Sequence, residues 1–384
     1  MTKICVYTTN RAEYSKLRPI LKILQNDKDI ELTLLVTGSH LLENYGRSID
    51  QIKKDGIHVT EEIYSHIAGD DLSKTVETIG IALLKLPSIL KRIDPDIILC
   101  GFDRFDMFPF AISASLMNYC LVHIEGGEIT GTLDEKIRHS ISKLSNYHIV
   151  STQDAKDNLI KMGEFEEKIF VTGCPRYDDL LLIDKNKDSN IISNVLRKYN
   201  VQEKEFFIIC YHPVSTDVEM SVRLWEVMLS SIKEIKNKII FIKSNIDYGN
   251  EELLNVYKKS NIGKLENIYL YKHIDIDDFS VLLKSCKCLI GNSSAGVREA
   301  CVFGTPVINI GKRQNFRIRK EMENVHTMQN FTKDELDKKI KEISNIIYKR
   351  NLVYGDGNAS TKIVKILKEI DTTDTSKVIS YINN

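Results

Sequence analysis

The chain has 384 residues, of which 42% are hydrophobic and 28% are charged, and its 53 Lys and Arg side chains balance its 53 Asp and Glu side chains. This length usually gives more than one domain, and the composition is that of an ordinary globular protein with an ample core. The zero net charge favours neither nucleic acid nor an anionic membrane as a partner, so an anionic ligand would need a local pocket.

Short β-branched strands alternate with amphipathic helices through the first half of the chain. We expect strands over residues 3–8, 30–36, 58–63, 96–100, 119–124 and 147–151, and helices over 13–25, 43–54, 72–92, 105–117 and 133–144. This alternation predicts a parallel sheet with helices on both faces.

The same pattern restarts after a less regular stretch at 173–200. Strands are expected over 206–211, 238–242, 267–270, 288–290 and 307–310, with helices over 218–235, 251–259, 277–284 and 295–303 between them. Two further amphipathic helices, 333–349 and 360–369, form the tail. The prediction is therefore an α/β protein with two Rossmann-like, doubly wound domains: an N-terminal domain at 1–172, a linker at 173–184, and a C-terminal domain at 185–384 that includes the tail helices. Ligands of such proteins bind at the carboxyl ends of the strands.

The eight cysteines predict reduced core thiols. Most lie in apolar, strand-like runs, and no second Cys or His pair completes a zinc pattern with Cys286 and Cys288. The first residues lack the apolar stretch of a signal peptide, and no apolar run approaches the roughly 20 residues of a membrane span. We expect a cytoplasmic protein that does not associate with membranes.

The stretch from Leu121 to His139 has the highest density of candidate functional groups. A buried-looking strand breaks at Gly126-Gly127 and a helix begins near Asp134. Six ionisable residues lie in this turn and in the start of the helix, where an α/β sheet places its chemistry: Glu125, Glu128, Asp134, Glu135, Arg138 and His139. The simpler alternative is two ordinary pairs, Asp134 with Arg138 and Glu135 with His139, on a solvated helix.

Two other strand ends in the first half carry charged residues. Asp103, Arg104 and Asp106 follow one strand, and two carboxylates beside an arginine at a buried strand end favour a functional role over a helix cap. Arg11 follows the first strand without a G-x-G-x-x-G motif, so it predicts either a phosphate contact or a surface ion pair.

The second half predicts a phosphate site. His212 ends its first strand, and Gly291-Asn292-Ser293-Ser294 begins a helix where small residues let backbone N–H groups approach a phosphate. Glu299, one turn later, could accept from ribose hydroxyls, whereas the alternative is a plain capped helix.

Taken together, these motifs resemble the UDP-N-acetylglucosamine 2-epimerases, in particular the hydrolysing branch that serves sialic-acid-type sugar synthesis. The matching motifs run in the same order from Asn10 to Val325: NRAEYSKL, DRFD, HIEGGEITGT, IRH, GCPRYD, SNID, IGNSSAGVRE, FGTPVIN and ENV. The resemblance implies two Rossmann-like domains in the architecture of many glycosyltransferases (GT-B-like).

The resemblance also implies roles for individual residues. It assigns nucleotide binding to Arg11, His212, Asn245, Ser293, Ser294, Glu299 and Arg313. It makes Asp103, Glu125 and Asp134 the catalytic carboxylates, completes the catalytic set with Arg138 and His139, and places Arg104 near the sugar or diphosphate. The implied reaction removes the C2 proton, expels the nucleoside diphosphate to leave a glycal, and adds water with inverted C2 configuration. It requires neither a metal nor a redox cofactor, and the roles of the three carboxylates stay open.

One departure from the family pattern bears on the sugar. Relatives that act on N-acetylglucosamine usually carry Gly where this chain has Phe102, and Met107, Phe108 and Phe110 add apolar bulk. An apolar wall suits a 6-methyl sugar, which favours the nucleotide form of N,N′-diacetylbacillosamine on the way to legionaminic acid. UDP-N-acetylglucosamine is the alternative substrate. More distant alternatives are a GT-B glycosyltransferase and an inactive nucleotide-sugar sensor. The sequence does not distinguish uracil from guanine as the base of the nucleotide. The resemblance further implies a homo-oligomer.

Overall fold

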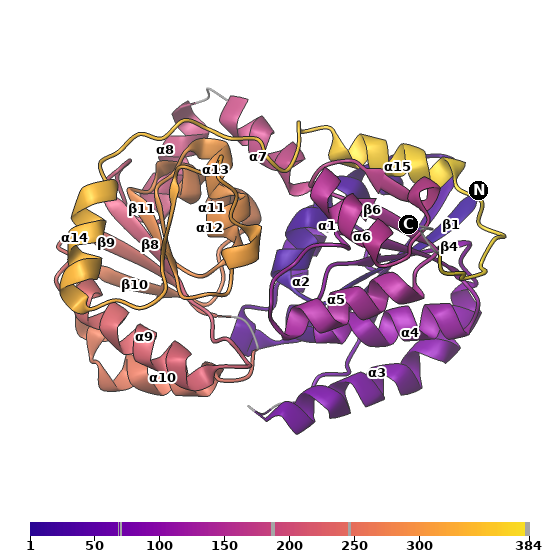
Figure 1. Ribbon diagram of the computed structural model, residues 1–384, viewed down its shortest axis with the longest axis horizontal. Coiled ribbons are helices and arrows are strands. Elements are labelled where there is room, and N and C mark those ends of the chain that lie inside the picture. The colour runs from indigo at the N-terminus through magenta and orange to yellow at the C-terminus, as the bar shows by residue number, and fades with distance from the viewer. Residues whose placement is uncertain (68, 70, 186–188, 245–246, 381–384) are drawn as a thin grey trace. The chain divides into compact units, whose positions relative to one another are not determined.

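The computed structural model divides the chain into two compact units, each with its own parallel sheet (Figure 1). The structure describes residues 1–67, 69, 71–185, 189–244 and 247–380. Unit 1 consists of Met1–Ile129, Leu133–Asp179 and Tyr354–Asn384, and unit 2 of Thr130–Thr132 and Leu180–Val353. Within the described residues, each helix is too short or too polar to cross a bilayer.

Unit 1 is built on a sheet whose seven described strands are all parallel, in the order β3-β2-β1-β4-β5-β6-β7. The strands are β1 Thr2–Thr8, β2 Ile30–Thr37, β3 Glu61–Ile63, β4 Ile97–Gly101, β5 Cys120–Ile124, β6 Tyr147–Val150 and β7 Ile169–Val171. The strand order reverses direction at β1, where β2 and β4 lie on opposite sides. That reversal is the point at which open α/β sheets bind ligands.

Helices cover this sheet, which explains why its central strands are apolar throughout their length. They are α1 Arg11–Asn26, α2 Ile49–Lys54, α3 Leu72–Ile93, α4 Phe108–Leu116, α5 Leu133–Leu144, α6 Gln153–Lys161, α7 Arg176–Lys185 and α15 Ala359–Glu369, with 3-10 turns η1 Gly38–Leu41, η2 Glu43–Tyr45, η3 Phe105–Met107 and η4 Glu166–Lys168. Asn10 caps α1, because its side chain accepts from the backbone N–H groups of Ala12 and Glu13.

Unit 2 repeats the plan with six described parallel strands in the order β10-β9-β8-β11-β12-β13. The strands are β8 Phe206–Cys210, β9 Lys238–Ile242, β10 Ile268–Tyr271, β11 Cys288–Gly291, β12 Val307–Ile310 and β13 Val325–Met328. Its helices are α8 Ser189–Lys198, α9 Val218–Ile232, α10 Asn250–Lys259, α11 Ile276–Ser285, α12 Ser294–Arg298, α13 Ala300–Phe303 and α14 Lys333–Ile343, with η5 Ile262–Lys264 and η6 Asn315–Arg317.

An aromatic stack forms part of the core of unit 2. The rings of Tyr211, Trp225, Phe241 and Tyr257 follow one another with centroid separations of 5.3, 5.4 and 5.1 Å and nearly parallel planes. The stack joins β8, β9, α9 and α10, and it anchors the end of β8, where His212 follows.

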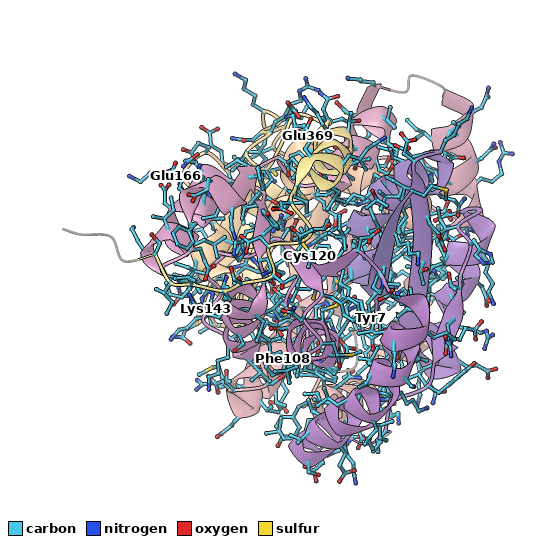
Figure 2. All side chains as sticks on the ribbon, turned by 90° about the vertical axis from the view of Figure 1, so that its right-hand side faces the viewer. Tyr7, Phe108, Cys120, Lys143, Glu166 and Glu369 are labelled. Atoms are coloured by element: carbon cyan, nitrogen blue, oxygen red, sulfur yellow. The ribbon has the colours of Figure 1, made fainter. Side chains whose placement is uncertain are left out.

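The C-terminal segment belongs to unit 1, whereas the sequence analysis placed it in the second domain. The apolar face of α15, with Ile363, Val364 and Leu367, is buried, and α15 packs against α1 (Figure 2, in which Glu369 marks the end of α15). After α15 the chain continues along unit 1, where the Tyr147 hydroxyl donates to the Asp371 carbonyl at 3.0 Å. The amphipathic pattern of a helix shows that one face packs on an apolar surface, but it does not identify that surface. The sequence alone therefore could not assign α15 to unit 1.

The predicted linker is also more regular than expected. The boundary between the units falls between Asp179 and Leu180, inside α7. Because α7 begins at Arg176, most of residues 173–184 are helical. The sequence did not predict the strands β7 and β13 or the helix α6. The two strands were missed because they have only three and four residues.

Candidate active site

Two neighbouring strands of unit 1, β4 and β5, end at the same level of the sheet. Gly101 pairs with Ile124, and the next residues, Phe102 and Glu125, adopt left-handed backbone conformations with φ of 76° and 62°. Both backbone N–H groups are still bound to neighbouring strands, at 2.9 Å to the Ile124 carbonyl and 2.8 Å to the Ile149 carbonyl. These turns bring Glu125 and the loop that carries Asp103 to one edge.

Glu125 is a buried carboxylate that accepts from donors in different segments. The Lys16 ammonium lies 2.5 Å from its Oε2, and the Cys174 thiol and the Ser151 hydroxyl lie 3.1 and 3.3 Å from its Oε1. The side chain is 3% exposed, so these donors replace the water that a carboxylate needs. Glu125 is therefore held in a defined orientation at the strand edge.

Lys16, on α1, is a site residue that sequence reasoning did not identify. Its ammonium lies 4.4 Å from the centre of the Phe102 ring, in addition to its contact with Glu125. A cation over an aromatic face is attracted by the ring quadrupole. The only sequence signal for Lys16 was its place in the NRAEYSKL motif, since Lys on a helix normally predicts a solvated face.

The position of Phe102 differs from the sequence-based expectation. It was expected to form an apolar wall beside the sugar, but its side chain is 3% exposed and its ring contacts Lys16. Any effect of Phe102 on the substrate therefore passes through Lys16 or through the loop that follows. The left-handed φ of 76° at Phe102 is an angle that glycine adopts without the steric penalty that other residues have.

Arg138 connects Asp103 to the rest of the site. It is fully buried, forms an ion pair with Asp103, and donates to the Glu128 carbonyl at 2.8 Å. A buried guanidinium is stable only when it is paired in this way. Arg138 thus joins the loop after β4, the Gly-Gly turn and α5, and its contacts make it a residue that positions Asp103.

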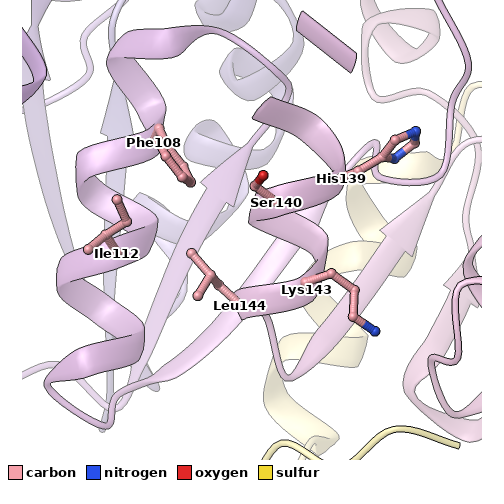
Figure 3. Close-up of a pocket in the computed structure, with 6 residues that line it drawn as sticks. All are labelled: Phe108, Ile112, His139, Ser140, Lys143 and Leu144. Atoms are coloured by element: carbon pink, nitrogen blue, oxygen red, sulfur yellow. The ribbon is translucent and has the colours of Figure 1, made fainter. Parts of the chain in front are cut away.

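Asp134 and His139, also predicted, lie on α5. Asp134 is in the first turn and is partly exposed. His139 Nε2 lies 3.3 Å from Glu135 Oε1, which is the pair that helical spacing predicted. His139 also lines a groove of about 430 Å³ with Phe108, Ile112 and Leu144, but its ring turns away from the apolar side chains between α4 and α5 (Figure 3).

The buried His123 forms a hydrogen bond with the first residue of the loop after β4, Phe102. His123 Nε2 lies 2.9 Å from the Phe102 carbonyl, and Nδ1 lies 3.0 Å from the Ser142 hydroxyl. Burial, with smaller contributions from the charges of His148 and Arg138, lowers the pKa of His123 to about 3. The neutral ring therefore donates from Nε2 to Phe102 and accepts at Nδ1 from Ser142.

The two arginines predicted to contact the diphosphate lie at the same edge. Arg11 is the first residue of α1, where a cation meets the positive end of the helix dipole. The Ala12 and Glu13 N–H groups already donate to Asn10, so an anion in that position would be bound by the Arg11 side chain with the help of the helix dipole. Arg104 Nε lies 3.6 Å from Asp106 Oδ1, so this arginine is ion-paired inside its own loop.

In unit 2, Asn292 organises the predicted nucleotide site, although sequence reasoning did not single it out. Its amide accepts from the His212 backbone N–H at 2.7 Å and donates to the His212 carbonyl at 2.8 Å. Its own carbonyl accepts from Arg313 at 3.2 Å and from Gln314 at 3.0 Å. Asn292 therefore joins the ends of β8 and β11 to the loop after β12.

The remaining predicted nucleotide residues have mixed outcomes. Ser293 caps α12, because its hydroxyl accepts from the Ala295 N–H at 3.3 Å, as in the simpler alternative of a capped helix. Ser294 is the first residue of α12, and Glu299 lies between α12 and α13. Asn245 lies outside the described residues.

Two Rossmann-like units with ionisable groups at their strand ends define an α/β protein of glycosyltransferase-B-like architecture. The family model described as UDP-N-acetylglucosamine 2-epimerase matches residues 22–368. The chain belongs to the UDP-N-acetylglucosamine 2-epimerase family, whose members are enzymes.

Individual relatives agree with this assignment. The chain is 33% identical to a Legionella pneumophila protein named UDP-N,N′-diacetylbacillosamine 2-epimerase (hydrolyzing), with 96% of both chains covered. It is 32% identical to a Neisseria meningitidis UDP-N-acetylglucosamine 2-epimerase, with 83% of this chain and 81% of the relative covered. A solved Neisseria meningitidis UDP-GlcNAc 2-epimerase bound to UDP-GlcNAc has the same fold, with a TM-score of 0.79 at 19% identity and coverage of 96% and 100%.

Proposed function

We propose that this protein is a hydrolysing nucleotide-sugar 2-epimerase, which converts a nucleoside-diphosphate 2-acetamido sugar into nucleoside diphosphate and the free 2-epimeric, manno-configured sugar. The observation that carries the proposal is the pair of carboxylates at adjoining strand ends, Asp103 held by Arg138 and Glu125 held by Lys16. The family membership and the hydrolysing relative support the same reaction.

The proposed chemistry uses these groups in two stages. In the first, a carboxylate takes the C2 proton, the C2–H electron pair forms a C1–C2 double bond, and the C1–O bond breaks so that its electron pair leaves with the diphosphate. Arg11 and Arg104 would stabilise the charge that develops on the diphosphate. In the second stage, water adds its oxygen to C1 and loses a proton to a carboxylate, while a carboxylic acid returns a proton to the opposite face of C2.

Assigning the three carboxylates to these steps requires experiment. Asp103→Asn and Glu125→Gln should reduce turnover by about a hundredfold or more while nucleotide binding persists, because general acid–base groups contribute about 10²–10⁴ in rate. Asp134→Asn is tested in parallel, with Glu31→Gln on the exposed amino end of β2 as a matched control. Near-normal rates in both the Asp103 and Glu125 variants would disprove the site assignment.

Unit 2 would bind the nucleotide. His212→Ala and Ser294→Ala should weaken the binding of nucleoside diphosphate, measured by calorimetry, more than they reduce turnover at saturation. The opposite division, with unchanged affinity and lost turnover, would place these residues at the reacting sugar instead.

For the sugar we propose N,N′-diacetylbacillosamine carried by UDP or GDP, which would place the product in legionaminic acid synthesis. The hydrolysing relative named for this sugar matches nearly the full length of the chain. UDP-N-acetylglucosamine remains the alternative, since a relative named for it is almost equally similar. Rates on the UDP and GDP forms of diacetylbacillosamine, compared with UDP-N-acetylglucosamine, decide between them.

One incubation separates the proposed reaction from other functions. In D₂O without an acceptor, the epimerase releases a manno-configured sugar with deuterium at C2. A glycosyltransferase would leave the substrate intact or hydrolyse it without label, and a nucleotide-sugar sensor would bind without turnover. The predicted cytoplasmic location and homo-oligomeric state stay predictions, to be checked by fractionation and by light scattering.

A further inference from the structure

A second buried pair of carboxyl groups lies beside the candidate site, and the proposed mechanism does not use it. Glu13, in the first turn of α1, and Asp106, in η3, both contact the hydroxyl of Thr9 at the end of β1. Thr9 Oγ1 lies 2.7 Å from Glu13 Oε2 and 2.8 Å from Asp106 Oδ1. Glu13 and Asp106 are 3% and 6% exposed.

The hydrogen count at Thr9 leaves room for only one ionised carboxylate. The hydroxyl has one proton and two lone pairs. One lone pair accepts from Asn10 Nδ2 at 3.0 Å. The proton can be donated to one carboxylate, so the remaining contact requires a carboxylic acid that donates to the second lone pair of Thr9.

The surroundings place this proton on Glu13. Arg104 Nε lies 3.6 Å from Asp106 Oδ1, so a positive charge faces the carboxyl group of Asp106. Within the described part of the chain Glu13 forms no ion pair, although the charge of Arg104 reaches it, and its Oε1 is buried without a hydrogen-bond partner. Glu13 Oε2 still accepts from the Thr9 backbone N–H at 3.0 Å, which a carboxylic acid can do.

We propose that Glu13 and Asp106 share a single proton through Thr9 and act as a positioning pair that holds the Asp103–Arg104 loop against the start of α1. Asp106 belongs to the same loop as Asp103 and Arg104, and Glu13 lies between Arg11 and Lys16 on α1. The pair therefore connects the two segments that carry these four candidate groups. Its kinetic consequences rest on the proposed function, but its protonation does not.

Loss of the proton would place two negative charges on either side of one hydroxyl in a buried setting. Burial and the charge of Asp106 raise the pKa of Glu13 to about 8. The other titratable groups that face the pair are Arg104 from its own loop, His66 after β3, Tyr7 on β1 and Cys100 on β4. Burial raises the pKa of Tyr7 and Cys100 and lowers that of His66, so none of these three supplies a compensating positive charge near pH 8.

The first test needs no substrate. The infrared difference spectrum between the wild-type protein and Glu13→Gln, at about pH 6.5, should show the C=O stretch of a buried carboxylic acid in the wild type. This band should disappear as the pH rises to about 9.5. A wild-type protein without the band at about pH 6.5 overturns the proposal, whatever the protein catalyses.

The second test is a pH profile. With the proton lost around pH 8, wild-type kcat/KM should fall about tenfold between about pH 7 and pH 9, mainly through KM for the nucleotide sugar. Glu13→Gln keeps a neutral donor toward Thr9, so this fall should be absent, whereas Glu13→Ala should lose activity at both pH values. Identical profiles for wild type and Glu13→Gln overturn the proposal.

Asp106→Asn tells the two partners apart. It removes the charge that Arg104 faces, so KM for the nucleotide sugar should rise about tenfold. It also removes the charge that helps to raise the pKa of Glu13, but burial remains, so the infrared band should persist at about pH 5 and disappear at a lower pH than in the wild type. If Asp106→Asn lacks the band even at about pH 5, the proton belongs to Asp106 and the assignment to Glu13 is wrong. Glu31→Gln, exposed on β2, is the control that should change neither readout.

Discussion

Replacing Phe102 by glycine sets two opposing effects against each other. The left-handed φ of 76° costs a non-glycine residue about 1–2 kcal/mol, which glycine recovers. Removing a buried phenylalanine side chain costs about 3–5 kcal/mol, and the ring also holds Lys16 at 4.4 Å. Packing should outweigh strain, so we expect Phe102→Gly to destabilise unit 1 by about 2–3 kcal/mol.

Thermal unfolding followed by circular dichroism, with hydrogen exchange of β4 and β5 as a local probe, measures this effect. A loss of this size lowers the midpoint by about 5–10 °C for a unit of this size. Phe102→Leu, which keeps the apolar volume and the strained backbone, should lose less than about 1.5 kcal/mol. It should still reduce turnover, because Lys16 then lacks an aromatic face.

Asn200→Gly is the matched control for backbone strain alone. Asn200 is exposed and has φ of 51°, so glycine there removes strain without removing packing, and stability should not fall. A Phe102→Gly protein that unfolds at the wild-type temperature or above it would refute the reasoning, since strain would then outweigh burial.

Three further predictions concern other contacts. Lys16→Met leaves Glu125 buried beside an apolar chain, so turnover should fall at least tenfold and Lys16→Arg should restore part of it in the D₂O assay. Asn292→Ala removes the two hydrogen bonds that hold the end of β8, so UDP binding measured by calorimetry should weaken about tenfold. Burial raises the pKa of Glu164, but hydrogen bonds from a buried histidine and two lysines, one of them Lys377, outweigh burial and lower this pKa to about 2. The resulting stability is present above about pH 4.5 and is lost as the pH falls toward 2, so Lys377→Met should move acid unfolding to higher pH; an unchanged acid midpoint would contradict this role for the tail.

The sequence alone predicted the alternation of strands and helices and the positions of the strand ends. These features are local, because the spacing of apolar residues and the presence of turn residues can be recognised within about ten positions. The parallel sheets then follow from the alternation, and so does the expectation that charged residues after neighbouring strands, such as Asp103 and Glu125, lie at one edge. The family motifs added the reaction class but no contacts.

Only the tertiary structure decided which groups are partners. Helical spacing offered Asp134 as a possible partner of Arg138, and the structure pairs Arg138 with Asp103 from another loop. Lys16 and Cys174 reach Glu125 from segments 109 and 49 residues away in the sequence.

The same holds for the proton-sharing pair and for the C-terminal helix. Thr9 and Asp106 are 97 residues apart, and they meet because β1 and β4 are neighbours in the sheet. The docking of α15 on α1 likewise depends on which apolar surface remains uncovered once the sheet has formed. Strand order and surface complementarity are properties of the whole chain, and no local periodicity encodes them.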